Sequence, residues 1–480
     1  MMARARSLRS ASGRPSGQRR PTGRAGIARA TLLAGALLAL PLGPTGSLPV
    51  RAQDVPCAGA EASPSPGPDE AVLMPEDARL ALFDQVWGTI DEGYLDETYN
   101  GVDWAAVGDE YAPYFLELEN AYEVYDLVRE MVGLLGDEDV VFTDSFAMEQ
   151  LTPEETEYVG IGALVDATSA EIEGLGPRIL FIFPGSGAEA AGLRVRDRIV
   201  SIEGDPCPTV RKIRGPEGTT VTLGIASPGE PPREVVVERR RIDPTVLPIS
   251  ARIGPKQRIG YLRLPSMEGQ PLFDAMNEAL AGFVDDPVRG LVIDVRSVTR
   301  GAPGITLALM SSLITGTGGS LWSRLEDAPV ELPESDLVGT LGTVPLVILV
   351  DKEAMGEAER LAMVLQAVGR ATIVGVETQG ITRTLQDVPL DDGSTLTLPT
   401  IGLQLPDGRR IVHEGVVPDV VSDVDWLDFP EARDPDIKAA LKVLAAATPL
   451  PAVIDVPAPS PAPGEPTPAT SPVPATGSNG

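Results

Sequence analysis

The chain has 480 residues, enough for two or three domains, and its hydrophobic share of 43 % is ordinary for a folded protein. Its 69 acidic residues outnumber the 39 lysines and arginines, which gives a formal net charge of −30. A surface of this sign repels nucleic-acid phosphates and anionic lipid head groups, so nucleic-acid binding is excluded as an expected function.

The first 52 residues differ in composition from the rest, since they contain nine arginines and no acidic residue. An apolar run follows at residues 30–42, and small residues precede Gln53 at the positions that a signal peptidase reads. This order is typical of a signal peptide, so we expect residues 1–52 to be removed on export to a secreted, periplasmic or cell-envelope location. A membrane anchor formed by an uncleaved segment 30–42 is the alternative, although the run is short for a span.

Residues 53–74 are rich in Pro, Ser and Ala and predict a linker. One of the two cysteines, Cys57, lies there, and the other is Cys207. Export would permit a disulfide between them, but the sequence does not show whether they are close, so pairing is left open.

Residues 75–152 have the periodicity of amphipathic helices. Apolar side chains recur at three- and four-residue steps over residues 80–94 and again over residues 125–135. Asn120 and Glu123 resemble a capping box at the start of the second helix. We therefore expect a small N-terminal helical bundle.

Over residues 153–243 the pattern changes to short β-like runs that glycine and proline interrupt, which predicts a β-rich module. The strand candidates are residues 179–183, 198–202, 219–225 and 234–239.

Residues 244–446 alternate between strand and helix patterns, which predicts an α/β core with buried strands. The strand candidates are residues 258–264, 290–295, 344–350 and 371–376. The helix candidates are residues 271–284, 304–315, 356–369 and 434–446.

Two hairpins are predicted late in the core, at the turns Asp392-Gly393 and Asp407-Gly408. Residues 447–480 are rich in Pro and Ala with few large apolar side chains, so we expect a disordered tail. The chain as a whole is expected to be a multidomain α/β protein.

Residues 159–164 (VGIGAL) and 184–204 (PGSGAEAAGLRVRDRIVSIEG) resemble a PDZ domain. The resemblance implies a carboxylate-binding loop that offers backbone N–H groups to a peptide C-terminus, which would add as a strand to an exposed edge. The residues of this loop are Gly160, Ile161, Gly162 and Ala163.

Two features depart from the PDZ pattern. Arg196 stands where the signature usually has glycine, and only about ten residues separate Gly204 from Arg214. That leaves little room for the helix that lines a PDZ groove, so peptide binding and a closed groove are both left open.

Residues 214–219 (RGPEGT) resemble the sequence that follows the PDZ groove in the C-terminal-processing, or tail-specific, serine peptidases of family S41. Further similar blocks follow in the family's order at residues 258–264, 290–296, 346–350, 374–378, 391–398 and 414–420. The resemblance implies amide hydrolysis by a Ser/Lys dyad, in which a desolvated lysine takes the proton of the serine. It also implies a glycine-rich loop whose N–H groups hold the oxyanion.

The dyad is missing from this sequence. Matching residues 354–359 (AMGEAE) to the family's serine block places Ala358 at the nucleophile, and matching residues 377–382 (ETQGIT) places Ile381 at the base. Gln386 matches a glutamine of the family with one residue displaced. The oxyanion stretch is rewritten too, since residues 297–301 read SVTRG in place of NPGG. Neither alkyl side chain can attack a carbonyl or move a proton.

Another pair of residues could replace the dyad. Of five lysines only Lys352 lies near Ala358 in sequence, and Ser297 or Thr382 could meet it. The single histidine, His413, limits a Ser-His-Asp triad and is expected in an exposed loop. The acidic doublets lack the spacing of a calcium loop, so neither a metal nor a cofactor is expected.

The sequence therefore predicts an exported S41-like pseudopeptidase that binds polypeptide C-termini, unstructured segments or a partner protein. An active peptidase with a rewired dyad and a structural envelope protein are the alternatives. A homo-oligomer is compatible with each of them.

Overall fold

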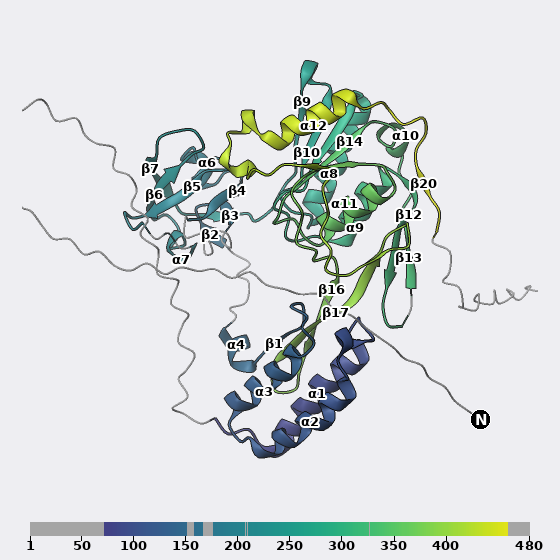
Figure 1. The fold of residues 1–480 in the computed structure, drawn as a ribbon. Coiled ribbons are helices and arrows are strands. Elements are labelled where there is room, and N and C mark those ends of the chain that lie inside the picture. The colour runs from purple at the N-terminus through teal and green to yellow at the C-terminus, as the bar shows by residue number, and fades with distance from the viewer. Residues whose placement is uncertain are drawn as a thin grey trace, which may run out of the picture. The chain divides into compact units, whose positions relative to one another are not determined.

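The computed structural model describes residues 72–150, 158–166, 176–206, 208, 210–325 and 327–458. The predicted signal peptide, most of the linker, Cys57 and Cys207 lie outside these residues, so export and the disulfide stay predictions. In chain order the structure has a helical region, a β-rich module and an α/β core, which confirms the multidomain α/β class (Figure 1). None of the helices in the described ranges combines the length and apolar character needed to cross a membrane.

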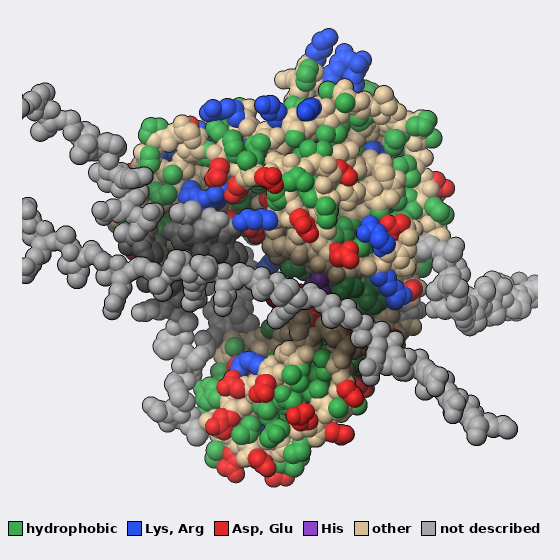
Figure 2. All heavy atoms as spheres, in the orientation of Figure 1, with side chains coloured by type: hydrophobic (Ala, Val, Ile, Leu, Met, Phe, Trp, Pro, Cys, Tyr) green, Lys and Arg blue, Asp and Glu red, His purple; other side chains and the backbone are tan. Residues whose placement is uncertain are grey.

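The helical region packs its apolar stripes into one buried cluster. Its helices are α1 (Glu76–Gly93), α2 (Trp104–Glu117), α3 (Ala121–Gly133) and α4 (Ser145–Gln150). The sequence predicted α1 and α3 but not α2, which has Pro113 in its interior. The cap of α3 is Asn120 alone, whose side chain accepts the N–H of Tyr122 at 3.1 Å. Figure 2 shows acidic side chains across the visible face of this region, with few basic ones.

The β-rich module is an antiparallel sheet in the order β3-β4-β5-β6-β7. Its strands are β3 (Ala163–Asp166), β4 (Arg178–Ile182), β5 (Arg198–Ile202), β6 (Thr220–Ala226) and β7 (Arg233–Glu238). Strand β2 (Tyr158–Gly160) pairs separately with β8 (Arg240–Ile242). The described part of the module also has two short helices, α6 (Gly187–Ala190) and α7 (Val210–Ile213). Strand β3 is an edge strand of this sheet.

The core contains a six-stranded sheet in the order β19-β15-β14-β11-β10-β9. Its strands are β9 (Ile249–Ile253), β10 (Ile259–Arg263), β11 (Gly290–Asp294), β14 (Leu346–Val350), β15 (Thr372–Gly375) and β19 (Val420–Val421). All neighbouring pairs are parallel except β9 with β10. The four predicted strands of this sheet are therefore confirmed.

Successive residues of these strands face opposite layers of helices, as the two-residue period of a strand requires. Leu262, Ile293 and Ile348 pack against α8 (Gln270–Asp285), α9 (Pro303–Ser311) and α11 (Glu357–Ala367). Their neighbours Tyr261, Val292 and Val347 pack against α12 (Pro435–Ala446). The result is a three-layer α/β/α arrangement (Figure 1).

A second sheet is built around β17 (Thr395–Gln404), which pairs with β1 (Val141–Thr143), β12 (Thr315–Trp322), β16 (Thr384–Pro389) and β18 (Arg410–Ile411). The β16–β17 and β17–β18 pairs are the two predicted hairpins. Strand β12 also pairs with β13 (Asp327–Glu331). The remaining elements are α10 (Val338–Leu341) and the single-turn helices Tyr99–Gly101, Pro255–Gln257, Trp426–Asp428 and Glu431–Arg433.

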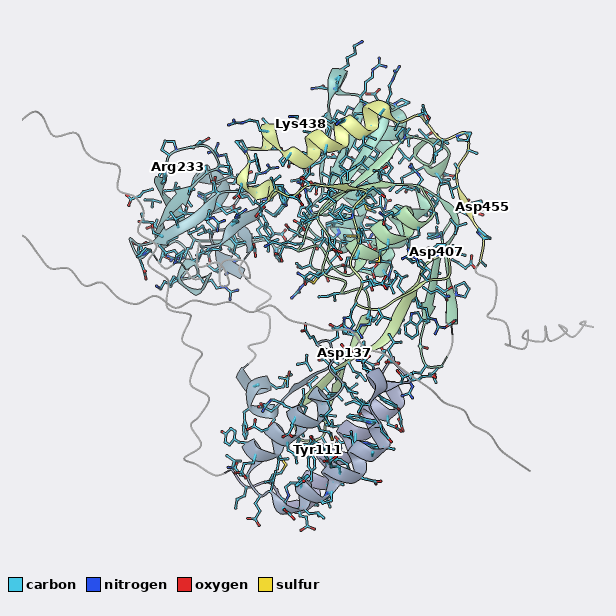
Figure 3. The ribbon with its side chains drawn as sticks, viewed as in Figure 1. Tyr111, Asp137, Arg233, Asp407, Lys438 and Asp455 are labelled. Atoms are coloured by element: carbon cyan, nitrogen blue, oxygen red, sulfur yellow. The ribbon has the colours of Figure 1, made fainter. Side chains whose placement is uncertain are left out.

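Two boundaries differ from the sequence analysis. The helix predicted over residues 304–315 ends at Ser311, and the glycine-rich residues after it enter β12. The predicted disordered tail begins too early, because β20 (Asp455–Val456) pairs with β12 and Val456 is buried. Asp455 marks this segment in Figure 3.

Candidate functional site

Ala358 lies in the first turn of α11, and its side chain is fully buried. Gly356, just before the helix, has a φ of 62°, a conformation that favours glycine. Its N–H donates to the carbonyl oxygen of Ile381 at 2.8 Å. The loop after β15 is thereby tied to the start of α11, and the two positions that the resemblance assigns to nucleophile and base lie on adjoining segments.

Glu359 holds this arrangement together from a fully buried position. Its carboxylate accepts the N–H of Gly380 at 2.6 Å, the N–H of Gly356 at 3.2 Å and the hydroxyl of Thr378. Burial raises the pKa of Glu359 above its ordinary value, although these donors act in the opposite direction. The sequence analysis missed this role, and its only signal was a glutamate in the first turn of an apolar helix.

The side chains at the two assigned positions carry no proton that can be transferred near neutral pH. Ala358 presents a methyl group, and Ile381 presents a half-buried alkyl chain. The hydroxyl of Thr382 lies next in sequence, is buried, and has no hydrogen-bond partner among the described residues.

The stretch assigned to the oxyanion loop follows β11 and packs against the start of α11. The carbonyl oxygen of Val298 accepts the N–H of Met355 at 2.9 Å. A Cβ added at Gly301 would lie 2.5 Å from the Cβ of Glu357, so glycine is required for this close packing. Residues 297–301 are thus held by backbone contacts beside the turn that carries Ala358.

Ser297 and Lys352 do not form a nucleophile–base pair in the described part of the chain. The Ser297 hydroxyl donates to Asp351 Oδ2 at 3.0 Å, and its N–H donates to Oδ1 at 2.8 Å. The Lys352 side chain is 57 % exposed, and its Nζ lies 3.6 Å from Glu353 Oε1. A lysine that acts as a general base must be desolvated, and this side chain is exposed.

Gln386 is exposed on β16, where it stands opposite Leu398 of β17. No hydrogen bond in the described ranges joins its side chain to the loop that carries Ile381. Its assignment to the family's glutamine stays a prediction.

The predicted carboxylate-binding loop connects β2 to β3. The carbonyl oxygen of Ile161 accepts the N–H of Ala188 at 2.7 Å, and that of Gly162 accepts the N–H of Phe183 at 3.0 Å. Gly162 has a φ of 78°, and a Cβ there would lie 2.2 Å from the Cβ of Ser186. Gly160 ends β2 and Ala163 begins β3. The loop therefore adopts a conformation that depends on glycine, next to an edge strand.

The helix that would line a peptide groove is short, as the sequence spacing suggested. It corresponds to α7, which spans only Val210–Ile213, with Ile213 buried. The main chain of β3 can pair with an added strand, but one helical turn offers it little side-chain contact.

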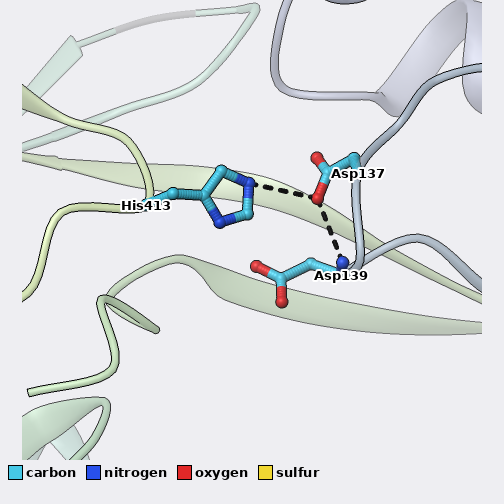
Figure 4. A group of neighbouring side chains, drawn as sticks. All are labelled: Asp137, Asp139 and His413. Carbon is cyan, nitrogen blue, oxygen red and sulfur yellow. Dashed lines mark hydrogen bonds and ion pairs between the residues drawn. The ribbon is translucent and has the colours of Figure 1, made fainter. Parts of the chain in front are cut away.

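Asp137, Asp139 and His413 gather in the only group among the described residues that could hold a metal ion (Figure 4). Arg383 takes the place of a cation there, since its guanidinium pairs with Asp137 at 2.7 Å and with Asp139 at 2.5 Å. Burial would raise the pKa of Asp137, but hydrogen bonds from Arg383 and Tyr94 outweigh it and lower the pKa to about 2. The cluster is an ion-pair network that joins the helical region to the core.

Comparison with known proteins agrees with this architecture. Residues 258–422 match peptidase family S41, and residues 75–133 match the tricorn protease C1 domain. The structure of a photosystem II D1 C-terminal processing protease superposes with a TM-score of 0.50 at 24 % identity, covering 77 % of this chain and 98 % of that one. This likeness shows the shared fold.

Among curated proteins, a carboxyl-terminal-processing protease of Synechocystis is 28 % identical over 78 % of this chain and 88 % of its own length. The carboxy-terminal processing protease CtpB of Bacillus subtilis is 26 % identical over 66 % of each chain. Over residues 258–422 the core therefore resembles peptidase family S41. Over about two thirds or more of its length the chain is similar to C-terminal-processing proteases.

Proposed function

We propose that this chain is an exported S41 homologue that holds polypeptide C-termini without cutting them. The observation that carries the proposal is the first turn of α11, where a buried Ala358 adjoins the loop of Ile381. The family's positions for nucleophile and base then carry two alkyl groups within an otherwise ordered scaffold. The relatives' names supply the class of ligand, a polypeptide C-terminus.

The loss of catalytic rate expected from alkyl side chains at these two positions is large. Removing the nucleophile of a serine peptidase costs about 10⁶-fold in kcat, and the rest of the site supplies only about 10³–10⁴ over water. Residues 297–301 also lack the glycine pair of the family's oxyanion loop. A binding function therefore fits the site better than hydrolysis does.

An active peptidase with a different nucleophile–base pair is the second candidate. It is favoured by the buried hydroxyl of Thr382, which has no hydrogen-bond partner among the described residues. The exposure of the Lys352 side chain argues against it, because a lysine that acts as a base must be desolvated. A purely structural envelope protein is the third reading.

Peptide binding tests the proposal directly. Two fluorescent peptides of one sequence, ending in a free carboxylate or in an amide, would be titrated with the chain lacking residues 1–52. We expect the carboxylate form to bind at least tenfold more tightly, because the loop's N–H groups recognise the charged terminus. Equal affinities would contradict recognition of C-termini, and binding of neither form would favour the structural reading.

Two matched glycine variants test whether the peptide carboxylate binds at the loop of residues 160–163. Gly162→Ala should abolish the preference for the carboxylate, because its Cβ would collide with Ser186. Gly185→Ala is the control, since Gly185 has a similar φ of 74° but no atom within 4 Å of an added Cβ.

A further inference from the structure

Arg196 occupies an unfavourable backbone position for an arginine. It precedes β5 with a φ of 79°, in the left-handed region that favours glycine. Arg196 is nevertheless only 6 % exposed, and the hydrogen bonds of its guanidinium go to residues outside the β-rich module. Strain of this kind persists where the surrounding structure compensates for it.

Hydrogen bonds to the core compensate for the strained backbone of Arg196. Nη1 of Arg196 donates to the carbonyl oxygens of Phe429 at 2.8 Å and Trp426 at 3.2 Å, and Nη2 donates to Asp434 Oδ2 at 2.7 Å. Asp434 is itself buried and caps α12 by accepting the N–H groups of Asp436 and Ile437. The guanidinium thus satisfies three acceptors that a neutral or shorter side chain could not reach together.

Trp426 is the centre of this contact. The guanidinium groups of Arg196, Arg263 and Arg296 lie 4.8, 5.0 and 4.0 Å from its ring centroid, within the range of cation–π attraction. Its Nε1 donates to Asp351 Oδ2 at 3.0 Å, the same carboxylate that holds the Ser297 hydroxyl. The ring therefore lies between the module and the loop that leads to the candidate site.

Two further arginines make contacts across the same boundary. Arg178 of β4 pairs with Asp425 at 2.8 Å and with Asp428 at 3.0 Å. Arg263 of β10 donates to the carbonyl oxygen of Leu180 at 3.1 Å. The carboxylates that pair with Arg178 are exposed and contribute little, whereas both partners of the Arg196–Asp434 pair are buried.

We propose that Arg196 is a latch that holds the β-rich module on the α/β core around Trp426 and Asp434. The strained backbone at Arg196 is kept because its side chain reaches across this boundary. With the latch closed, edge strand β3 keeps one position relative to Ala358. The proposal does not depend on whether the chain binds or cleaves peptides.

The test is hydrogen exchange, with small-angle X-ray scattering, on the full chain carrying Arg196→Gly. Glycine suits the left-handed backbone, so the module should keep its own fold, and exchange within β6 should not change. We expect exchange over residues 426–434 to rise at least tenfold and the radius of gyration to increase. Arg196→Lys, which keeps the charge but not the planar fork, should give the same changes to a smaller extent.

Arg194→Ala is the matched control, because Arg194 is half-exposed and its side-chain partners among the described residues, Glu230 and Ser227, belong to its own module. It should behave as the unaltered chain does. Unchanged exchange and scattering in both Arg196 variants would overturn the latch. A rise in exchange within β6 would overturn it too, because Arg196 would then support the module's own fold.

Discussion

Glu359 determines the local shape of the candidate site, because one buried carboxylate binds both the start of α11 and the loop that carries Ile381. We predict that Glu359→Gln destabilises the chain by about 1–3 kcal/mol, since the amide must turn one of its N–H groups toward groups that are themselves donors. Urea unfolding measures the change.

Glu377→Gln is the control for that substitution, because Glu377 belongs to the same loop but is exposed. It should change the free energy of unfolding by less than about 0.5 kcal/mol, as surface substitutions usually do. Equal effects of the two variants would show that the buried carboxylate does not hold the loop.

Single residues were partly predictable from the sequence. The blocks around Ala358 and Ile381 could be placed by their resemblance to the family, and the structure brings their segments together. The bonds of Ser297 to Asp351 and of Arg196 to Asp434 could not be predicted, because each joins residues 54 or more positions apart. No local pattern carries that information.

At the scale of elements, local sequence patterns predicted most strands of the core sheet but missed α2 and β12. The strands β10, β11, β14 and β15 were predicted from apolar runs that match their burial. Helix α2 was missed because proline is unusual inside a helix. Strand β12 was missed because it is rich in glycine and is completed by β17, β13 and the distant β20.

The segment after α12 gives an element-scale prediction. Val456 is buried in the core cluster, and Thr315 donates to Asp455 at 2.9 Å. A chain that ends at residue 446 should lose about 2 kcal/mol of unfolding free energy relative to one that ends at residue 458, mainly from exposing this valine. Thermal and urea unfolding of the two truncated chains measure it, and equal stability would show that β20 adds nothing.

The ion pair between Asp137, in the loop after α3, and Arg383, just before β16, should make the stability of the chain depend on pH. Asp137 has a folded-state pKa of about 2 against an ordinary value of 3.8, so it favours the folded state above the ordinary value. This contribution, about 2 kcal/mol, should be lost as the pH falls from about 4 through 2. Asp137→Asn should flatten this part of the stability curve.

Glu138→Gln is the matched control for the pH measurement, because Glu138 is exposed and adjacent in sequence. The unfolding free energy of this variant should fall in acid as it does in the unaltered chain. If the same fall persists in Asp137→Asn, other carboxylates cause the loss of stability in acid.

At the scale of the whole molecule, the chain combines a core that resembles peptidase family S41 with alkyl side chains at the two positions that the resemblance assigns to nucleophile and base. Its net charge of −30 should repel nucleic-acid phosphates, so we expect the chain not to bind nucleic acid. If residues 1–52 are a signal peptide, the chain exported from a suitable host should begin at Gln53, which N-terminal sequencing would show. An intact N-terminus would favour the membrane-anchored alternative.

The most direct test of the central claim is incubation of the chain with an unstructured protein substrate, followed by mass spectrometry of the products. We predict no cleavage above that in buffer, because neither Ala358 nor Ile381 can take part in proton transfer. Cleavage that disappears in Lys352→Ala or Thr382→Val, but persists in the exposed control Lys438→Ala (Figure 3), would contradict the account.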